Sequence, residues 1–484
     1  EGTFTWGNHF KNFAACFDPR LTTKSTEFLF LYAWCDALVK SMPEGSFTPS
    51  LATSWSMSPD GLTYTFNLRK GVKFHNGDEM TAEDVKFSYD RYEGNASDLL
   101  RERISRVEIV DPYTINFVLK APWNDFMEYY AGTGVSGASW IVPKKYVEEV
   151  GNDEFVKHPI GAGPYKVVSV EPGVNAVMEA YEDYWRKVPH VKTMVFDAVA
   201  ERSTNFAKLK VGEVDVAMSM KGPLAAAVME DPDMTYYSSR SASVLMLIPA
   251  KQWDPQSPWS NVKVRQAASL ALDRQVLVDS VFPGSLIPGQ FMPDEMFGVK
   301  KFPVDPYDEE KAKQLLADAG YPNGFDGGKF YGVNTYSDTY NVAVTYWNNI
   351  GINVELELYD NAVYYQKAYN GELDGIIFDS TSGGVTAAYR VWRLVEDISG
   401  HYGQYDDITA LNEQQKVEQD PTKRADIINQ IQQLVHDQYM VIPLHQNANP
   451  CGVGLRVKAH MMGASASPCW WPAPYEDVEL WPDK

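Results

Sequence analysis

The chain has 484 residues, a formal net charge of −21 at pH 7 and 44% hydrophobic residues. It is longer than the size at which one hydrophobic core stops growing, so two or more domains are expected. Nucleic acid and anionic membrane surfaces should repel so acidic a chain, so neither is expected as a partner. No apolar run in the sequence is long enough to span a bilayer.

The first quarter of the chain predicts strands and helices in alternation. Phe4–Trp6 is expected to form a first strand, and Ser25–Leu38 a helix. From Leu62 to Arg69 apolar and polar residues alternate, which predicts a half-buried strand. Thr81 then precedes Ala-Glu-Asp, a pattern typical of a helix N-terminus with acidic residues in its first turn. A hairpin is predicted over residues 107–119.

Two segments that contain glycine follow. Ala131–Ser139 is rich in glycine and serine and is predicted to be a surface loop. Pro159–Tyr165 reads PIGAGPY, where glycine would permit an unusual backbone as the chain returns from a subdomain. This segment lacks the lysine and hydroxyl pattern of a phosphate loop and the third glycine of a dinucleotide fingerprint, so no nucleotide site is predicted.

The second half of the chain continues the alternation. The apolar run Ser243–Pro249 suits a strand that crosses between lobes. Val262–Leu272 predicts a helix, and Asp273 is expected to cap the next one. A further helix is expected to start at Asp305-Pro306 and to end at Gly320.

The motif Gly-Glu-aliphatic-Asp occurs twice, at residues 212–215 and 371–374, each time between a predicted helix and a predicted strand. This echo fits two lobes that are built alike. A late strand, Val441–Leu444, leads to His445. The alternation of helices and strands in both halves predicts an α/β fold with two lobes.

The sequence contains none of the catalytic motifs that would indicate an enzyme. G-x-S-x-G, H-E-x-x-H and the Walker A pattern are all missing. No pair among the eight histidines has metal-ligand spacing within a helix. His75 is expected to have a structural role. His445 has two interpretations: a polar residue bonded at a strand end, which is favoured, or a ligand contact.

Aromatic residues make up 13% of the chain. Tyrosine and tryptophan offer a rigid apolar surface with one polar atom, which suits the recognition of sugars, peptides and aromatic rings. Most of them should fill cores. Tyr336, Trp253 and Trp392 occur in polar or loop-like contexts and are the better candidates for a binding site.

The four cysteines are Cys16, Cys35, Cys451 and Cys469. An even, low number fits an oxidising compartment, and four cysteines allow three pairings. Sequence proximity favours Cys16 with Cys35 and Cys451 with Cys469. The alternative is that they are buried free thiols. Their spacing does not indicate a zinc site.

Several of these segments together resemble one family. The residues of LATSW, DGLTYTFNLR, GVKFHNG and TAEDV, all between Leu51 and Val85, match the signature of the family 5 extracellular solute-binding proteins. These are the oligopeptide, dipeptide and nickel-type receptors of ABC importers. PIGAGPY matches a further family block, with Ala162 where threonine is usual. VRQAASLALDR and DPYDEEKAKQLLADAGYPNGF match two more, so the resemblance covers most of the chain.

The resemblance implies an α/β, bilobal periplasmic-binding-protein fold of the large cluster C type, with an extra subdomain in the first lobe. Lobe 1 is then expected at residues 1–43, 160–245 and 455–484, and the extra subdomain at 44–159. Lobe 2 is expected at 246–454.

The resemblance also implies a function. The chain would be the substrate-binding component of an ABC importer, an extracytoplasmic monomer whose signal peptide is absent from this sequence. It would bind a small ligand between its lobes, and the closed form would dock on a membrane permease. No cofactor and no metal are expected. The rival classes are a hydrolase of the same ligand, which the missing motifs disfavour, and a chaperone-like or signalling receptor.

The expected ligand is peptide-like or sugar-like. Peptide-binding members carry a block of the form F-D-x-x-x-x-G-W-x-x-D-x-x-D-P, whose aspartate neutralises the peptide ammonium group. Here Phe378-Asp379 begins that block, but its Gly-Trp and Asp-Pro elements are missing. A buried ammonium group without a carboxylate is costly, which favours an oligosaccharide or opine-like ligand. Peptide-like ligands stay slightly ahead because they predominate in the family. The absence of histidine or methionine clusters disfavours nickel and haem.

The residues expected to contact the ligand share one property, a position at a strand end or in a loop that should border the space between the lobes. They are Asn8, His9, Ser219, Trp253, Tyr336, Asp379, Ser382, Trp392 and His445.

Overall fold

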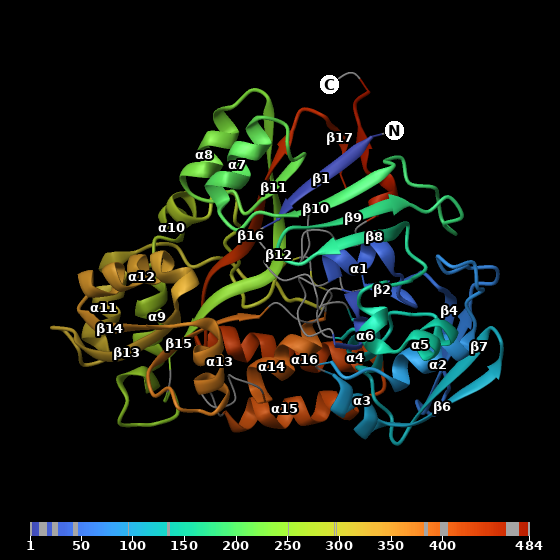
Figure 1. Ribbon diagram of the computed structural model, residues 1–484. Helices are drawn as coiled ribbons and strands as arrows, with labels where there is room; N and C mark the ends of the chain where they lie inside the picture. Colours follow the sequence, from blue (N-terminus) through green and yellow to red (C-terminus); the bar gives the residue numbers. More distant parts are fainter. Residues whose placement is uncertain are drawn as a thin grey trace. The chain divides into compact units, whose positions relative to one another are not determined.

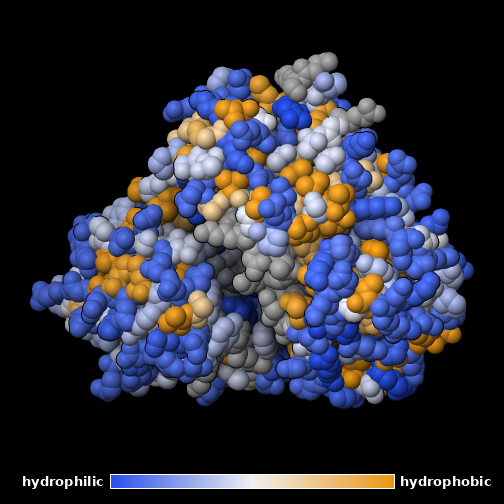
Figure 2. Space-filling view, viewed as in Figure 1, coloured by the Kyte–Doolittle hydropathy of each residue, from blue (hydrophilic) through white to orange (hydrophobic). Residues whose placement is uncertain are grey.

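The structure is a computed structural model that describes most of the chain. The described residues are 2–8, 17–21, 28–41, 47–94, 96–132, 136–249, 251–294, 296, 298–381, 386–396, 405–460 and 474–482. Within these ranges no helix is both long and apolar enough to cross a membrane. Hydrophilic side chains cover most of the face seen in Figure 2, as the acidic composition predicts.

The chain folds into two compact units (Figure 1). Unit 1 holds the described residues between Glu1 and Arg240 and between Asn449 and Lys484. Unit 2 holds those between Ser241 and Ser382 and between Thr386 and Ala448. Two strands contain residues of both units: β12 (Met234–Ile248) and β16 (Ile442–Gly454). The predicted strand at Ser243–Pro249 is confirmed as the second part of β12, but the change of unit falls just before it, between Arg240 and Ser241.

Unit 1 contains a mixed sheet in the order β11-β1-β10-β9-β8. Its strands are β1 (Thr3–Asn8), β8 (Tyr165–Glu171), β9 (Asn175–Ala180), β10 (Thr193–Ala198) and β11 (Val216–Met218). β1 lies between β10 and β11 and is parallel to both. The β16 residues Cys451–Val453 pair antiparallel with β11. Phe4 and Trp6 of β1 are fully buried, and the predicted first strand is an interior strand of this sheet.

A second sheet of unit 1 has the order β4-β5-β7-β6 and a core of its own. Its strands are β4 (Ala52–Met57), β5 (Thr63–Leu68), β6 (Ile104–Asp111) and β7 (Thr114–Leu119). All of them fall within the range expected for the extra subdomain. Two short pairs complete the unit: β2 (Val39–Ser41) with β3 (Phe47–Pro49), and β17 (Val457–Ala459) with β18 (Glu479–Leu480).

The helices of unit 1 are short. They are α1 (Phe28–Trp34), α2 (Ala82–Asp90), α3 (Ser97–Arg103), α4 (Phe126–Ala131), α5 (Lys144–Val150), α6 (Asn152–Phe155), α7 (Arg202–Lys210) and α8 (Pro223–Glu230), with 3₁₀ turns at Pro19–Leu21 and Tyr475–Asp477. The predicted start of α2 is confirmed: Asp84 accepts a hydrogen bond from the Thr81 backbone N–H at 2.8 Å, which is half of a capping box.

Unit 2 is built on the strand order β14-β13-β15-β12. β13 (Phe325–Val333) is parallel to β14 (Ile352–Tyr359) and to β15 (Ile376–Thr381), whereas β12 is antiparallel to β15. Eight helices are described here: α9 (Val262–Leu270), α10 (Arg274–Val281), α11 (Glu309–Asp318), α12 (Ser337–Asn349), α13 (Asn361–Tyr369), α14 (Ala387–Glu396), α15 (Asp406–Val417) and α16 (Pro421–Asp437). Pro258–Ser260 and Asn334–Tyr336 are 3₁₀ turns. One large apolar core joins the sheet to the helices.

Both copies of the Gly-Glu-aliphatic-Asp motif connect a helix to a strand, as predicted. Gly212 follows α7 with φ of 75°, and Gly371 follows α13 with φ of 67°. A left-handed residue of this kind ends a helix, and glycine adopts it without a Cβ penalty. The N-cap prediction at Asp273 is also confirmed, because its carboxylate accepts from the Gln275 and Val276 N–H groups.

Three details differ from the sequence predictions. α11 starts at Glu309 with Asp308 as its cap, because the Asp308 side chain accepts from the Lys311 N–H, so the expected start at Asp305-Pro306 is too early. The predicted surface loop 131–139 is wrong in its described part: Ser136, Ala138 and Ser139 are buried.

The third difference concerns PIGAGPY. Gly161 and Gly163 do not have the positive φ that an unusual backbone would require. Glycine is needed here because the chain passes against α1: a Cβ on Gly163 would lie 2.4 Å from the Trp34 carbonyl carbon, and one on Gly161 would lie 2.3 Å from the Trp34 oxygen.

Candidate functional site

Polar side chains of unit 2 gather where its parallel strands end. Tyr336 follows the carboxyl end of β13, and Ser380 lies at the carboxyl end of β15. The antiparallel strands β12 and β16 bring Ser243 and Asn447 to the same place. Ligands of open α/β sheets commonly bind beyond the carboxyl ends of parallel strands. We call Ser243, Tyr336, Ser380 and Asn447 the polar cluster.

The members of the polar cluster bond to one another through their side chains. The hydroxyls of Ser243 and Ser380 are 2.8 Å apart. The Asn447 amide nitrogen lies 3.3 Å from the Ser243 hydroxyl, 3.3 Å from the Tyr336 hydroxyl and 3.4 Å from the Ser380 hydroxyl. Burial raises the pKa of Tyr336, so its hydroxyl stays protonated at neutral pH. The cluster is therefore a set of uncharged hydroxyl and amide groups.

Asp379 is next to the cluster in sequence and is only 1% exposed. Its Oδ1 accepts hydrogen bonds from its neighbour's backbone N–H at 2.8 Å and from Arg393 Nη2 at 3.3 Å. Its Oδ2 has no hydrogen-bond partner within the part of the chain that the structure describes. A buried carboxylate oxygen without a donor is unfavourable, so this atom is an acceptor that a ligand could use. Arg393 of α14 already balances the charge of Asp379.

Aromatic rings surround Tyr336 and fix its position. Its ring centroid lies 5.8 Å from that of Phe378 and 6.2 Å from that of Phe282. Phe282 in turn stacks on His445 at 4.7 Å, and the His445 side chain is completely buried. His445 thus packs behind Phe282, one of the rings that contact Tyr336. It lies inside β16 and not at a strand end, so its expected position is wrong, and whether it contacts the ligand stays a prediction.

The two predicted tryptophans lie in different places. Trp253 is 39% exposed, and its neighbour Gln252 bonds to the Met440 carbonyl, which precedes β16. Ser243 lies five residues before the end of β12, which is about 16 Å along an extended strand, so Trp253 is separate from the polar cluster. Trp392 is half-buried in α14, contacts Tyr389 with a centroid distance of 5.5 Å, and immediately precedes Arg393.

The remaining described candidates belong to unit 1. Asn8 is fully buried at the carboxyl end of β1, and Ser219 directly follows β11. Ser219 has a φ of 63°, a left-handed conformation that is uncommon for a residue other than glycine. His9 and Ser382 lie outside the described residues.

His75 has the structural role expected from the sequence. Its Nε2 lies 3.0 Å from the Gly163 carbonyl, and its Nδ1 lies 3.3 Å from the Gly161 N–H. These contacts require a neutral ring with the proton on Nε2. Burial lowers the pKa of His75 to about 4, with a smaller contribution in the same direction from Lys166.

Cys35 and Cys451 are buried thiols that take part in no disulfide. The Cys35 sulfur lies 3.3 Å from the Ile141 carbonyl. The favoured pairing is therefore not formed at these two positions, and the alternative of buried thiols applies to both. Cys16 and Cys469 lie outside the described residues. Among the described side chains, no group of three or more His, Cys, Asp or Glu could hold a metal ion.

Sequence reasoning missed Ser243, Arg393 and Asn447. Ser243 begins an apolar run, and Arg393 lies in an amphipathic helix, so neither stands out by pattern. Asn447 was missed because β16 was expected to end at Leu444, whereas the strand continues to Gly454.

Residues 46–397 match the family model of the bacterial extracellular solute-binding proteins, family 5 Middle. The chain belongs to this family. The resemblance predicted from the signature segments is thereby confirmed.

Among curated proteins, this family 5 chain is 31% identical over 363 residues to heme-binding protein A of Haemophilus influenzae, covering 68% of this chain and 65% of that protein. It is 32% identical over 281 residues to the glutathione-binding protein GsiB of Escherichia coli O157:H7, covering 57% of this chain and 53% of GsiB. The matches thus span from about half to just under two thirds of these relatives' lengths.

Solved structures share the fold along nearly the whole chain. NikA of Brucella suis in complex with Fe(III)-EDTA has a TM-score of 0.84 at 19% identity, covering 99% of this chain and 100% of NikA. DppA of Helicobacter pylori in complex with the peptide STSA has a TM-score of 0.74 at 23% identity, covering 99% and 98%. AgaA of A. tumefaciens R10 in complex with agropinic acid has a TM-score of 0.74 at 23% identity, covering 99% of both chains. These likenesses establish the α/β periplasmic-binding-protein fold.

Proposed function

We propose that this family 5 protein is the extracytoplasmic solute-binding component of an ABC importer and delivers a small polar ligand to a membrane permease. The proposal combines family membership with one local observation. The polar cluster and the open Asp379 Oδ2 lie at the carboxyl ends of parallel strands, where ligands of such sheets bind. The lobe boundaries expected from the sequence, at 245/246 and 454/455, remain part of this proposal.

The ligand class that we propose first is a peptide-like solute. Peptide groups carry one donor and one acceptor each, and the cluster offers serine hydroxyls, an amide and a phenol as complementary partners. Asp379 Oδ2 is buried and would accept an N–H of the ligand. DppA, which shares the fold, was solved with the peptide STSA.

A specific observation favours a second ligand class, a sugar or opine-like conjugate. Arg393 lies 3.3 Å from Asp379 and balances its charge, so this carboxylate is not available to neutralise a peptide ammonium group without competition. Hydroxyl groups of a sugar need no counter-charge and match the uncharged members of the cluster. AgaA was solved with agropinic acid.

We also propose that the protein binds this ligand without converting it. The family consists of solute-binding proteins, which supports a receptor over the rival hydrolase. Incubation of the purified protein with each bound ligand, followed by mass spectrometry, should return the ligand unchanged. Turnover that a single carboxylate substitution abolishes would instead identify a hydrolase.

The experiment that tests the receptor role is a thermal-shift screen followed by calorimetry, because a ligand that binds the folded state raises its melting temperature. The protein is first unfolded and refolded to remove any bound solute. The panel contains dipeptides, oligopeptides, oligosaccharides and amino-acid–sugar conjugates. A rise with one class identifies the ligand, and the absence of any rise would contradict the proposed role for these ligands.

Two variants localise the site. Ser380→Ala removes one hydroxyl of the cluster, and Asp379→Asn removes the charge while keeping the shape. Each should weaken binding by about tenfold, as expected for the loss of a buried hydrogen bond. Asp318→Asn, on the exposed part of α11, is the matched control and should bind as the wild type does. Equal affinity in all four proteins would place the ligand elsewhere.

A further inference from the structure

Tyr336 and Asn447 of the polar cluster come from elements that are not neighbours in the sheet. In the strand order β13-β15-β12-β16, two strands separate β13, which Tyr336 follows, from β16, which contains Asn447. Tyr336 lies in a 3₁₀ turn beyond the end of β13, so hydrogen bonds between strands do not hold it. A contact outside the sheet is therefore needed to keep the Tyr336 hydroxyl 3.3 Å from the Asn447 amide nitrogen.

One segment of unit 2, residues 274–286, contacts β16 repeatedly. It consists of α10 and the turn that follows it, and we call it the α10 segment. Arg274 is buried, and its Nε donates to the Pro443 carbonyl at 2.7 Å. At the other end of the helix, the Phe282 ring stacks on the His445 ring with a centroid distance of 4.7 Å. Both ends of the helix are thus attached to β16.

The turn after α10 adds a third contact, next to the polar cluster. Residues 282–285 read Phe-Pro-Gly-Ser, and a hydrogen bond of 3.0 Å from the last N–H to the first carbonyl closes the turn. Gly284 has a φ of 86°, the left-handed conformation that the third position of a type II turn requires. Leu286 then accepts the Gln446 N–H at 2.7 Å. Gln446 directly precedes Asn447, so this bond fixes the backbone that bears the Asn447 side chain.

The α10 segment also contacts the other side of the cluster. α10 packs against α12, the helix whose N-cap residue is Tyr336 (Figure 1). The buried Phe282 ring lies 6.2 Å from the Tyr336 ring. The same ring stacks on His445, two residues before Asn447. Phe282 therefore connects the turn that carries Tyr336 to the strand that carries Asn447.

We infer that the α10 segment positions the polar cluster, with Phe282 as the residue that holds Tyr336 against Asn447. The inference rests on the proposed receptor function, in which the cluster binds the solute. Phe282 acts through Tyr336 and through the backbone of β16, so it is a positioning residue. Donors and acceptors that are held in place before binding lose less conformational freedom when the solute arrives, which raises affinity.

The side-chain amide of Asn447 reports on this role in the absence of any solute. Its exchange with water is measured by saturation transfer in protein labelled with 15N-asparagine, and its resonances are assigned from Asn447→Asp. Tyr336→Phe removes one acceptor and should speed this exchange about fivefold, as expected for the loss of one hydrogen bond. Phe282→Leu should speed it to a similar extent, because the Tyr336 hydroxyl would no longer be held in place.

Phe325→Leu is the matched control. Phe325 lies at the start of β13, at the opposite end from Tyr336, and packs against the rings of Trp259 and Tyr321 with centroid distances of 5.7 Å and 4.9 Å. It removes an aromatic ring from the same unit without contacting the polar cluster. If Phe282→Leu changes the Asn447 exchange no more than Phe325→Leu does, the inference is overturned.

A second pair of variants decides the question if Phe282→Leu does not fold. Gly284→Ala strains the turn and keeps the Phe282 ring. Gly328→Ala imposes similar strain in β13, where φ is 78° and no atom lies within 4 Å of the new Cβ. Gly284→Ala should speed the Asn447 exchange, and Gly328→Ala should leave it unchanged. Equal exchange in these two variants would overturn the inference.

A binding arm uses each solute that raises the melting temperature of the wild type. Phe282→Leu should weaken binding by about tenfold and should add little to the loss caused by Tyr336→Phe, because both act through the same hydroxyl. Phe325→Leu should bind as the wild type does. If Phe282→Leu alters the Asn447 exchange but not the affinity, the positioning role stands and the cluster is not the solute site. If no solute binds the wild type, the receptor proposal fails for the panel, and the exchange measurement still decides the positioning role.

Discussion

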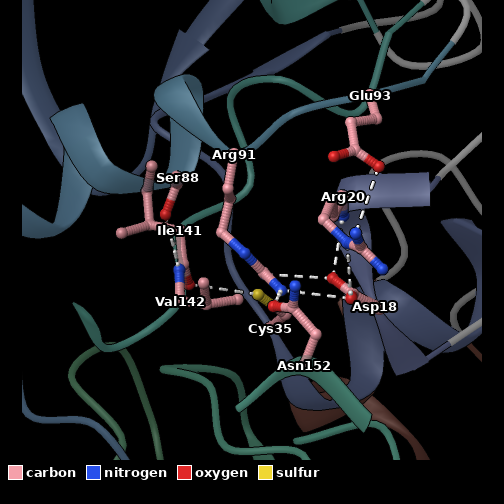
Figure 3. A network of polar contacts seen from close by, with 9 residues as sticks. All are labelled: Asp18, Arg20, Cys35, Ser88, Arg91, Glu93, Ile141, Val142 and Asn152. Carbon is pink, nitrogen blue, oxygen red and sulfur yellow. Dashed lines mark hydrogen bonds and ion pairs between the residues drawn. The ribbon is translucent and has the colours of Figure 1, made fainter. Parts of the chain in front are cut away.

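Arg91 forms a two-pronged ion pair with Asp18: Nη1 lies 3.0 Å from Oδ1, and Nη2 lies 3.1 Å from Oδ2 (Figure 3). Arg20 approaches the same carboxylate at 3.3 Å, and Arg91 also donates to the Asn152 side chain at 2.7 Å. Asp18 is 1% exposed. Through these hydrogen bonds and ion pairs, the network links the short segment 17–21 to the end of α2 and to the start of α6.

Asp18→Asn should lower the free energy of unfolding by about 3–5 kcal/mol, because it leaves a largely buried guanidinium without its counter-charge. Urea unfolding followed by circular dichroism measures the change. Lys86→Gln is the control: it removes an exposed ion pair with Asp90 on α2 and should cost at most about 1 kcal/mol. Equal effects of the two substitutions would mean that the Asp18 network contributes no more than a surface pair.

His75 should make stability depend on pH below neutrality. The unfolded chain binds a proton at this ring below about pH 6.5, whereas the folded protein does so only near its lowered pKa of about 4. The stabilisation from a neutral His75 is therefore complete above about pH 6.5 and is lost as the pH falls toward about 4, by at most about 3 kcal/mol.

The measurement compares the wild type with His75→Asn by urea unfolding between about pH 7.5 and about pH 4.5. Carboxylates elsewhere titrate in both proteins and cancel in the difference. Burial raises the pKa of Tyr181, whose ring contacts His75, so this phenol stays neutral over the range. The free energy of unfolding of the wild type, relative to that of His75→Asn, should fall steadily as the pH is lowered. If this difference between the two proteins does not change with pH, His75 does not have the lowered pKa.

Gly163→Ala should destabilise the protein through a steric clash. The new Cβ would lie 2.4 Å from the Trp34 carbonyl carbon and 2.5 Å from the Cys35 nitrogen. These are backbone atoms, which cannot move away as the end of a flexible side chain could. A loss of about 1–3 kcal/mol or more is expected. At Gly454 a Cβ would meet its nearest atoms at 3.5 Å, an ordinary contact, so Gly454→Ala should be nearly neutral. The melting temperatures of both variants, measured against that of the wild type, test this prediction. A Gly163→Ala protein that melts at the wild-type temperature would contradict the packing described.

Cys35 should be unreactive in the folded protein. It is completely buried, and burial raises the pKa of its thiol well above the usual value. Iodoacetamide should modify this residue only after unfolding, as detected by peptide mapping, and Cys451 should behave in the same way because it is 1% exposed. Detection of a disulfide-linked peptide that contains Cys35 would contradict this prediction and would support the pairing favoured by sequence proximity.

Local patterns predicted the elements whose signals are short-range. Examples are the alternation around Phe66, the cap at Asp273 and the glycine turns at Gly212 and Gly371. Each depends only on residues within one turn or one strand, so a short stretch of sequence is enough to predict it. The predicted start of α11 was wrong by a few residues because two aspartates, Asp305 and Asp308, both suit a helix start. Only the structure shows that the Asp308 carboxylate accepts from the helix backbone.

The sequence by itself determined the family, through signature segments spread over much of the chain, and with it the α/β fold. Tertiary structure decided which side chains meet. Ser243, Tyr336, Ser380 and Asn447 lie as far as 204 residues apart in sequence and bond to one another because the middle parts of β12 and β16 pass the carboxyl ends of β13 and β15. Strand order is set by packing over the whole unit, and no local pattern encodes it.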